Sequence, residues 1–139
     1  MYSYFPVFAY YLQDAITDPV RVGILRDLAD ADVVDGLAIT VYKNEETQQI
    51  THQGYGAQYR LRIDFVYSVA VVSPLSEAVC NEAASRVVEA LAPGSDIHCT
   101  YDGTPYSMYI EKVKDTVEFK NQFYVETVTF AGYTHFKEI

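Results

Sequence analysis

The stretch YRLRIDFVYSVAV, residues 59–71, decides the fold because apolar and polar side chains alternate along it. The apolar positions are Tyr59, Leu61, Ile63, Phe65, Tyr67, Val69 and Val71. The positions between them include Arg60, Arg62, Asp64 and Ser68. Successive side chains of a strand point to opposite faces, so this alternation predicts one long strand with a buried face. Because it is the longest such run in the chain, we expect it at the centre of a sheet.

Two helices are predicted, one before and one after this strand. The first carries apolar residues at steps of three and four, namely Phe5, Phe8, Leu12 and Ile16, and ends at Asp18-Pro19. The second is expected to open at Ser73-Pro74 and to end at Pro93-Gly94. Its apolar stripe is formed by Leu75, Val79, Ala83, Val87 and Leu91. We expect this second helix to cover the strand face that bears Ile63, Phe65, Tyr67 and Val69.

Four shorter runs rich in β-forming residues complete the predicted sheet. They span Leu37 to Tyr42, Ile97 to Tyr101, Tyr106 to Val113 and Gln122 to Phe130. The order of elements predicts a single α+β domain over residues 1–139, with an antiparallel-rich mixed sheet of four to five strands and both helices packed on one face.

Residues 43–58 are polar and include the turn-prone sequence Gly54-Tyr55-Gly56, which predicts a long exposed loop. A loop longer than about 12 residues inside a compact domain is usually functional or disordered. We therefore expect intersubunit or partner contacts here, with Tyr55 as the anchor. The candidate interface residues are Gln53, Tyr55, Gln58 and Tyr59.

The composition excludes several classes of function. The chain has 10 Lys and Arg against 19 Asp and Glu, and a formal net charge of −9 opposes broad binding to phosphate backbones or anionic lipid. No apolar run is long enough to cross a membrane, and the first residues lack a basic signal-peptide region, so assembly in the cytoplasm is expected. The two cysteines, Cys80 and Cys99, are expected to be reduced.

No catalytic, cofactor or metal signature is found. The histidines His52, His98 and His135 lie in separate segments without metal-ligand spacing. The string Asp30-Ala-Asp32-Val-Val-Asp35-Gly36 is similar to the start of an EF-hand loop, but its third carboxylate comes one residue late and Val41 occupies the twelfth position. We therefore expect a protein that is not an enzyme and needs no cofactor, although residues distant in sequence can converge in space.

The element order also resembles a known family. It begins with Val20 to Leu25, the Asp-rich turn and Gly36-Leu37-Ala38-Ile39, and continues with the strand Arg60 to Val71. An Ala-rich helix, Ser76 to Leu91, follows, and then a short strand and a closing strand pair that ends in Phe123 to Phe130. This pattern covers most of the chain and resembles the tail terminator proteins, also called minor capsid or tail completion proteins, of long-tailed bacteriophages.

The resemblance implies a virion subunit that forms a ring, usually a hexamer, on top of the tail tube and joins the tail to the neck of the DNA-filled head. Its partners would be further copies of itself, the tail tube protein and a neck or head-completion protein. In such a ring the acidic turn is a candidate lining for the DNA channel, through Asp27, Asp30, Asp32 and Asp35. Two alternatives stay open: another neck or head-completion connector, and a small-molecule or regulatory binding domain.

Overall fold

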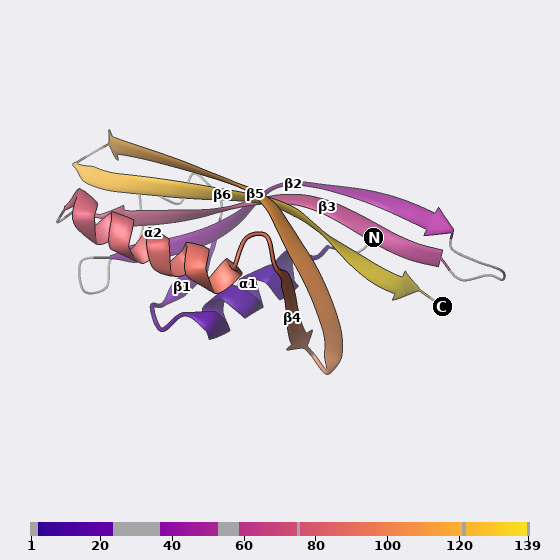
Figure 1. Cartoon of the computed structure of the whole chain (residues 1–139). Coiled ribbons are helices and arrows are strands. Elements are labelled where there is room, and N and C mark those ends of the chain that lie inside the picture. The colour runs from indigo at the N-terminus through magenta and orange to yellow at the C-terminus, as the bar shows by residue number, and fades with distance from the viewer. Residues whose placement is uncertain (1–2, 24–36, 53–58, 75, 121, 139) are drawn as a thin grey trace.

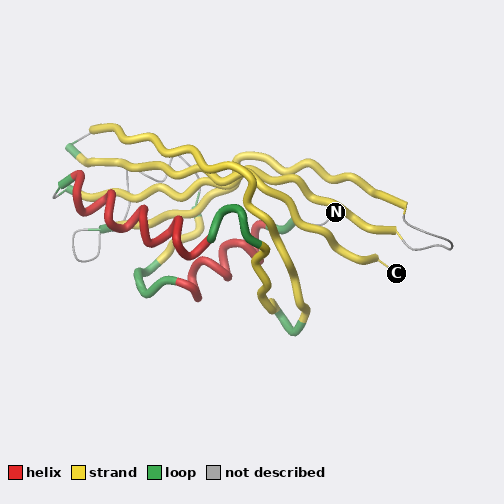
Figure 2. Tube along the Cα trace, in the orientation of Figure 1, coloured by secondary structure: helices red, strands yellow, loops and turns green. Residues whose placement is uncertain are grey.

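The computed structural model describes residues 3–23, 37–52, 59–74, 76–120 and 122–138. Two helices and six strands are present in this part of the chain (Figures 1 and 2). In chain order they are α1 (Phe5–Ala15), β1 (Val20–Val22), β2 (Ala38–His52), β3 (Tyr59–Ser73), α2 (Glu77–Leu91), β4 (Asp96–Tyr101), β5 (Thr104–Lys120) and β6 (Phe123–Glu138).

The strands form one mixed sheet in the order β1-β2-β3-β6-β5-β4. All neighbours pair antiparallel except β1 and β2, which are parallel. The predicted α+β class is confirmed, but the strand number was too low. The missing strand is β1, whose three residues Val20–Val22 are too short to show any alternation.

Both helices cover the same face of the sheet, as expected (Figure 1). The alternating residues of β3 supply the core beneath them, and Ile63, Phe65 and Tyr67 are at most 1% exposed. The predicted partner of this face was partly wrong. The Phe65 ring stacks on Tyr4 at 5.7 Å and meets Phe8 of α1 at 5.9 Å, so the aromatic part of the core lies under α1 rather than α2.

The start of α2 also differs from the prediction. Ser73 is the last residue of β3, and the helix is capped by Ser76, whose side chain accepts a hydrogen bond from the Val79 amide at 3.2 Å. A Ser-Pro pair suits a helix start, but the pairing of Ser73 with Tyr124 of β6 keeps this residue in the sheet. Both cysteines are free, and Cys80 is buried.

The sheet bends along one line that crosses four strands. Asn44 is an extra residue in β2 opposite Tyr67 and Val66, and Glu111 is an extra residue in β5 opposite Ala131 and Gly132. These two bulges lie at the same level because Val66 pairs with Ala131 in the middle of the sheet. Bulges bend strands and increase their twist, which agrees with the sharp change of direction of β5 in Figure 1.

The predicted loop over residues 43–58 is wrong for its first ten positions. Lys43–His52 continues β2 and pairs with β3 as far as Tyr59. The remaining residues, 53–58, lie outside the described part of the chain. A strand at the edge of a sheet needs backbone pairing on one side only, so low hydrophobicity does not prevent it from forming. Deleting residues 46–53 would therefore remove half of a strand.

Glu46 shows why this polar strand is firmly held. Its carboxylate oxygen Oε1 accepts hydrogen bonds from the Tyr67 hydroxyl at 2.6 Å, the Ser3 hydroxyl at 2.8 Å and the Phe5 amide at 3.3 Å. The amide belongs to the first turn of α1, where a negative charge also complements the helix dipole. Burial and then the bond to Glu46 raise the pKa of Tyr67, so this hydroxyl stays a donor.

We expect Glu46→Ala to lower the free energy of unfolding by about 1 to 3 kcal/mol, because the buried Tyr67 hydroxyl would lose its acceptor. The neighbouring Glu45 is exposed on the opposite face of the strand, so Glu45→Ala is the matched control and should change stability by less than about 0.5 kcal/mol. Urea denaturation of both variants measures this difference. Equal effects would contradict the role assigned to Glu46.

Candidate assembly surface

Most residues of the two sites expected from the sequence, the interface and the channel lining, lie outside the described part of the chain. Asp27, Asp30, Asp32 and Asp35 lie outside the described residues, as do Gln53, Tyr55 and Gln58. Tyr59 is the first residue of β3, where it pairs with Glu138 of β6, and its side chain is not described. Both expectations, the interface and the channel lining, therefore stay predictions.

The described residues point instead to the second half of β5. The outer neighbour β4 pairs with β5 only as far as Tyr109, and no described strand continues along that edge beyond it. All side chains from Glu111 to Phe119 are exposed. An unpaired strand edge presents free N–H and C=O groups, so a strand of another chain can pair with this segment.

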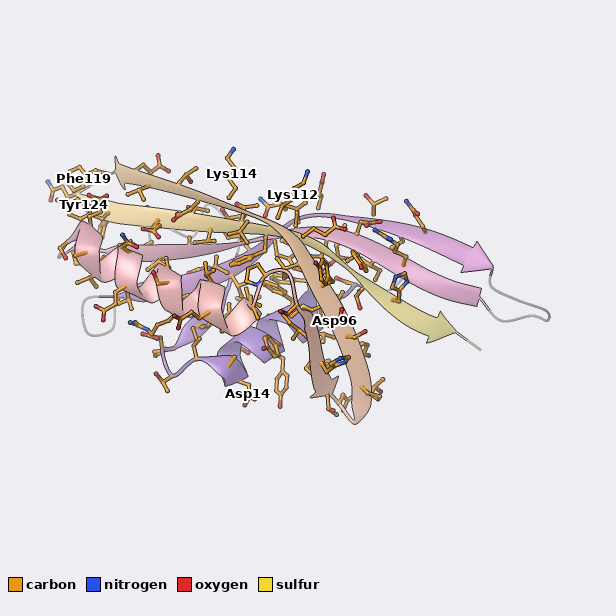
Figure 3. The ribbon with its side chains drawn as sticks, in the orientation of Figure 1. Asp14, Asp96, Lys112, Lys114, Phe119 and Tyr124 are labelled. Carbon is orange, nitrogen blue, oxygen red and sulfur yellow. The ribbon has the colours of Figure 1, made fainter. Side chains whose placement is uncertain are left out.

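The face of this segment that is turned toward the helices carries three apolar side chains and Asp115, which pairs with Val128 of β6. Val113, Val117 and Phe119 pair with Phe130, Glu126 and Tyr124 of β6, which places them on the helix-bearing side of the sheet. They are 39%, 45% and 64% exposed, because the helices do not extend over them. We call these three residues the hairpin surface. Phe119 lies at the tip beside Tyr124, with ring centroids 4.8 Å apart (Figure 3).

The opposite face of the same strand carries two lysines and Glu118. Lys112 and Lys114 pair with Ala131 and Thr129, on the side of the sheet away from the helices, and both point outward in Figure 3. The two lysines are separated by one residue, and the same segment also contains Glu111, Asp115 and Glu118. The strand therefore has a largely apolar face that includes Asp115 and an opposite face of mixed charge.

Two carboxyl groups lie between this strand and α2. Asp115 of β5 pairs with Val128 and Glu126 of β6 pairs with Val117, so the two acids are diagonal neighbours on the same face. Together with residues of α2 they line a cleft of about 260 Å³. Glu126 is 2% exposed. Burial, followed by the charge of Asp115 and a hydrogen bond shared with it, raises the pKa of Glu126 to about 7. This shift favours the protonated, neutral form of the Glu126 carboxyl group.

We expect this carboxyl group to make stability depend on pH. The pKa of Glu126 in the folded protein lies above its ordinary value of 4.5, so the folded protein binds this proton more tightly than the unfolded chain does. The stability gained from this binding is complete below pH 4.5 and is lost as the pH rises through about 7. Glu126→Gln keeps the neutral shape and should unfold at a higher temperature than the parent at pH 8, with little difference at pH 4.5. The shift corresponds to at most roughly 3 kcal/mol. Calorimetry at the two pH values measures it, and a constant difference would contradict the assignment.

A second apolar hollow lies on another part of the molecule, between α1, β1 and the end of β4. We call it the α1 groove. Its volume is about 310 Å³, and it is lined by Phe5, Pro6, Ala9, Tyr10, Gln13, Val22 and Tyr101. Tyr10 and Val22 are 44% and 55% exposed, and the rings of Tyr10 and Tyr101 lie 5.3 Å apart. Large apolar side chains that remain exposed around a hollow are typical of a contact site.

The described residues contain no group of three or more His, Cys, Asp or Glu that could hold a metal ion. Within the same residues, no helix has the length and hydropathy needed to span a bilayer.

Comparison with known proteins supports the fold. No protein-family model matches the chain, and no curated protein matches its sequence. A solved structure from the virion of a native gene transfer agent particle is similar over 90% of this chain and 84% of that chain, with 17% identity and a TM-score of 0.50. A second solved structure is similar over 92% and 86%, with 17% identity and a TM-score of 0.52. At this identity the likeness shows a shared fold.

Proposed function

We propose that this chain is a structural protein of a phage-like virion, without enzymatic activity, that acts by assembling with copies of itself. The observation that carries the proposal is the strand segment Glu111 to Phe119, which is exposed on both faces and leaves Val113, Val117 and Phe119 uncovered on the helix side. The fold shared with a protein from a gene transfer agent virion supports a virion role. Assembly would cover a surface that is a liability in an isolated subunit.

Within the virion, we propose the position of a tail terminator: a ring, with six copies as the expected number, between the tail tube and the neck. Its partners would be the tail tube protein on one side and a neck or head-completion protein on the other, with assembly in the host cytoplasm. The resemblance of the sequence pattern to the tail terminator proteins supports this position. DNA would pass through the ring without sequence-specific binding, as the net charge of −9 favours.

The two sequence-derived sites belong to this proposal. The acidic turn with Asp27, Asp30, Asp32 and Asp35 would face the DNA channel, because like charges keep phosphates from adhering. The candidate interface residues Gln53, Tyr55, Gln58 and Tyr59 would contact a neighbouring subunit or the tail tube. A virion reconstruction that puts the acidic turn on the outside of the ring would exclude the channel role.

Particles produced without this chain test the terminator role. We expect DNA-filled heads and separate tails whose length is no longer uniform, because nothing would stop growth of the tail tube. Electron microscopy of the lysate measures tail length and attachment. Tails of normal length that fail to join heads would instead favour a head-completion connector, the second candidate, and complete virions would exclude both.

A further inference from the structure

The second half of β5 forms an open edge of the sheet, starting where the pairing with β4 ends. Among the described strands none pairs with this edge beyond Tyr109, and all side chains from Glu111 to Phe119 are exposed. The helix α2 packs against β6 and β3, so it leaves the outer edge of β5 open. The backbone groups along this edge are therefore accessible to a further strand.

This edge segment is electrically neutral although the chain is acidic. Residues 111–120 contain three acids and three lysines, namely Glu111, Asp115, Glu118, Lys112, Lys114 and Lys120. The formal net charge of −9 therefore comes from the rest of the chain, and that charge makes copies repel one another. A neutral edge allows two copies to approach each other here with less repulsion than at an acidic surface.

The order of charges along the segment is complementary to itself when the strand is reversed. If two copies run antiparallel about a twofold axis at Thr116, Lys114 of each copy lies opposite Glu118 of the other. Both side chains lie on the face of the sheet away from the helices. Opposite charges directly across two antiparallel strands stabilise their pairing, and the twofold symmetry makes this contact twice.

The apolar side chains of the hairpin surface also meet in this arrangement. Val113 of one copy lies opposite Phe119 of the other, and Val117 lies opposite Asp115. Asp115 shares a hydrogen bond with Glu126 of its own copy, so its carboxyl group keeps a polar partner. The two hairpin surfaces join into one apolar patch across the axis, and covering part of it adds hydrophobic stabilisation to the charge pairs.

Other registers of the two strands are less favourable. A shift by one residue would exchange the faces of one strand, so only shifts by two residues compete. Such a shift in one direction places Asp115 opposite Asp115, and in the other direction it places Lys114 opposite Lys120. Like charges directly opposite each other destabilise a pair of strands. With the axis at Thr116, Lys112 and Lys120 face each other only at the ends of the paired segment.

We propose that free subunits form a twofold dimer in which the second half of β5 pairs antiparallel with the same segment of a second copy, with Thr116 on the axis and Lys114 opposite Glu118. A contact of this symmetry closes after two copies, so it goes beyond the ring of the proposed function and does not depend on it. It covers the open edge before assembly. The pair separates when β5 contacts another surface of the next copy in the ring.

Two charge reversals test the pairing. Lys114→Glu places acids opposite each other in both halves of the contact, and Glu118→Lys places lysines there. We expect each variant to raise the dissociation constant of the dimer by about tenfold or more, as measured by sedimentation velocity. Both side chains are exposed, so the fold is retained. Lys43→Glu and Glu45→Lys make the same charge changes at exposed positions of β2 and should dimerise like the parent.

A mixture of the two weakened variants is the decisive sample. Lys114→Glu carries two acids at the paired positions and Glu118→Lys carries two lysines, so a heterodimer between them restores both attractive pairs. We expect the mixture to dimerise like the parent, whereas each variant alone is weakened. A mixture that associates no better than its components would overturn the proposed pairing.

A cysteine on the axis tests the register. Thr116→Cys places two thiols directly opposite each other, at a Cα separation that a disulfide can bridge, so mild oxidation should give a covalent dimer. Lys112→Cys is the control on the same face of the same strand, because the two positions lie at opposite ends of the contact. Cys80 and Cys99 are present in both variants, so the comparison removes their effect. Equal crosslinking of the two variants would overturn the proposal.

The parent protein gives the remaining outcome. We expect it to sediment as a dimer that dissociates on dilution. A parent that stays monomeric at the highest soluble concentration would overturn the dimer and leave the edge to a strand of a different protein. The ring is observed separately in assembled particles, so its presence or absence does not decide the result.

Discussion

Phe65→Ala is expected to lower the free energy of unfolding by about 3 to 5 kcal/mol, one of the two largest single-residue effects in the chain. Phe65 is 1% exposed and lies where β3 meets α1. Its ring stacks on Tyr67 at 4.5 Å and on Tyr4 at 5.7 Å. Removing the ring leaves a cavity between helix and sheet that these large, rigid neighbours cannot fill by small movements.

Phe119→Ala is the matched control, because it makes the same substitution at a phenylalanine that is 64% exposed. We expect a change of less than about 0.5 kcal/mol in the free energy of unfolding of the isolated subunit. Chemical denaturation of both variants at a concentration where the parent is dissociated measures the difference. Equal losses of stability would show that Phe65 is not the centre of the core.

Gly132→Ala is expected to cost about 3 kcal/mol or more, or to prevent folding. A Cβ atom at this position would lie 2.2 Å from the carbonyl oxygen of Tyr109 and 3.1 Å from the Cα atom of Ile110. Both are backbone atoms of β5 at the Glu111 bulge, so neither can move aside without breaking the pairing of the two strands. Glycine is required here because the backbones approach each other closely.

Gly103→Ala provides the comparison for this effect. Gly103 has a φ of +78° in the turn between β4 and β5, and an added Cβ atom would meet nothing within 4 Å. Its cost comes from the left-handed backbone alone and should be about 1 to 2 kcal/mol. Thermal melts of both variants rank the two costs. A Gly132→Ala protein as stable as Gly103→Ala would contradict the close approach at the bulge.

The elements that bury one face were predictable from the sequence. Alternation over residues 59–71 identified β3, and apolar residues at helical spacing identified α1 and α2. These signals arise because each element must cover its apolar face with another. The choice between α1 and α2 as the cover of Phe65 was beyond this reasoning, since both helices offer similar apolar stripes and only the three-dimensional packing decides.

The second halves of β2 and β5 were not predicted as strands, and the reason is physical. The second halves of β2 and β5 are stabilised by backbone hydrogen bonds to one neighbour and bury few side chains, so their sequences carry no strong apolar signal. In β5 a signal was present, because Val113, Val117 and Phe119 alternate with polar residues, but the three lysines and two glutamates of residues 111–120 obscured it. The bulges that bend both strands have no signature in a single sequence.

The exposed surface on β5 was missed in the sequence because it, too, has no strong apolar signal. Sequence reasoning placed the contacts in turns, where polar residues and Tyr55 or the aspartates gather. The structure adds a surface on a regular strand, which becomes visible only when β4 is seen to end its pairing at Tyr109 and the helices are seen to leave Phe119 uncovered. Exposure of an apolar residue depends on which elements lie above it, and composition does not contain that information.

The most direct test of the account is a cryo-electron microscopy reconstruction of the intact particle that encodes this chain. We expect a closed ring of copies between the tail tube and the neck, with the β5 segment Glu111 to Phe119 of each copy in contact with the next. A particle in which the chain is absent, or in which this segment faces solvent without any protein neighbour, would contradict the account.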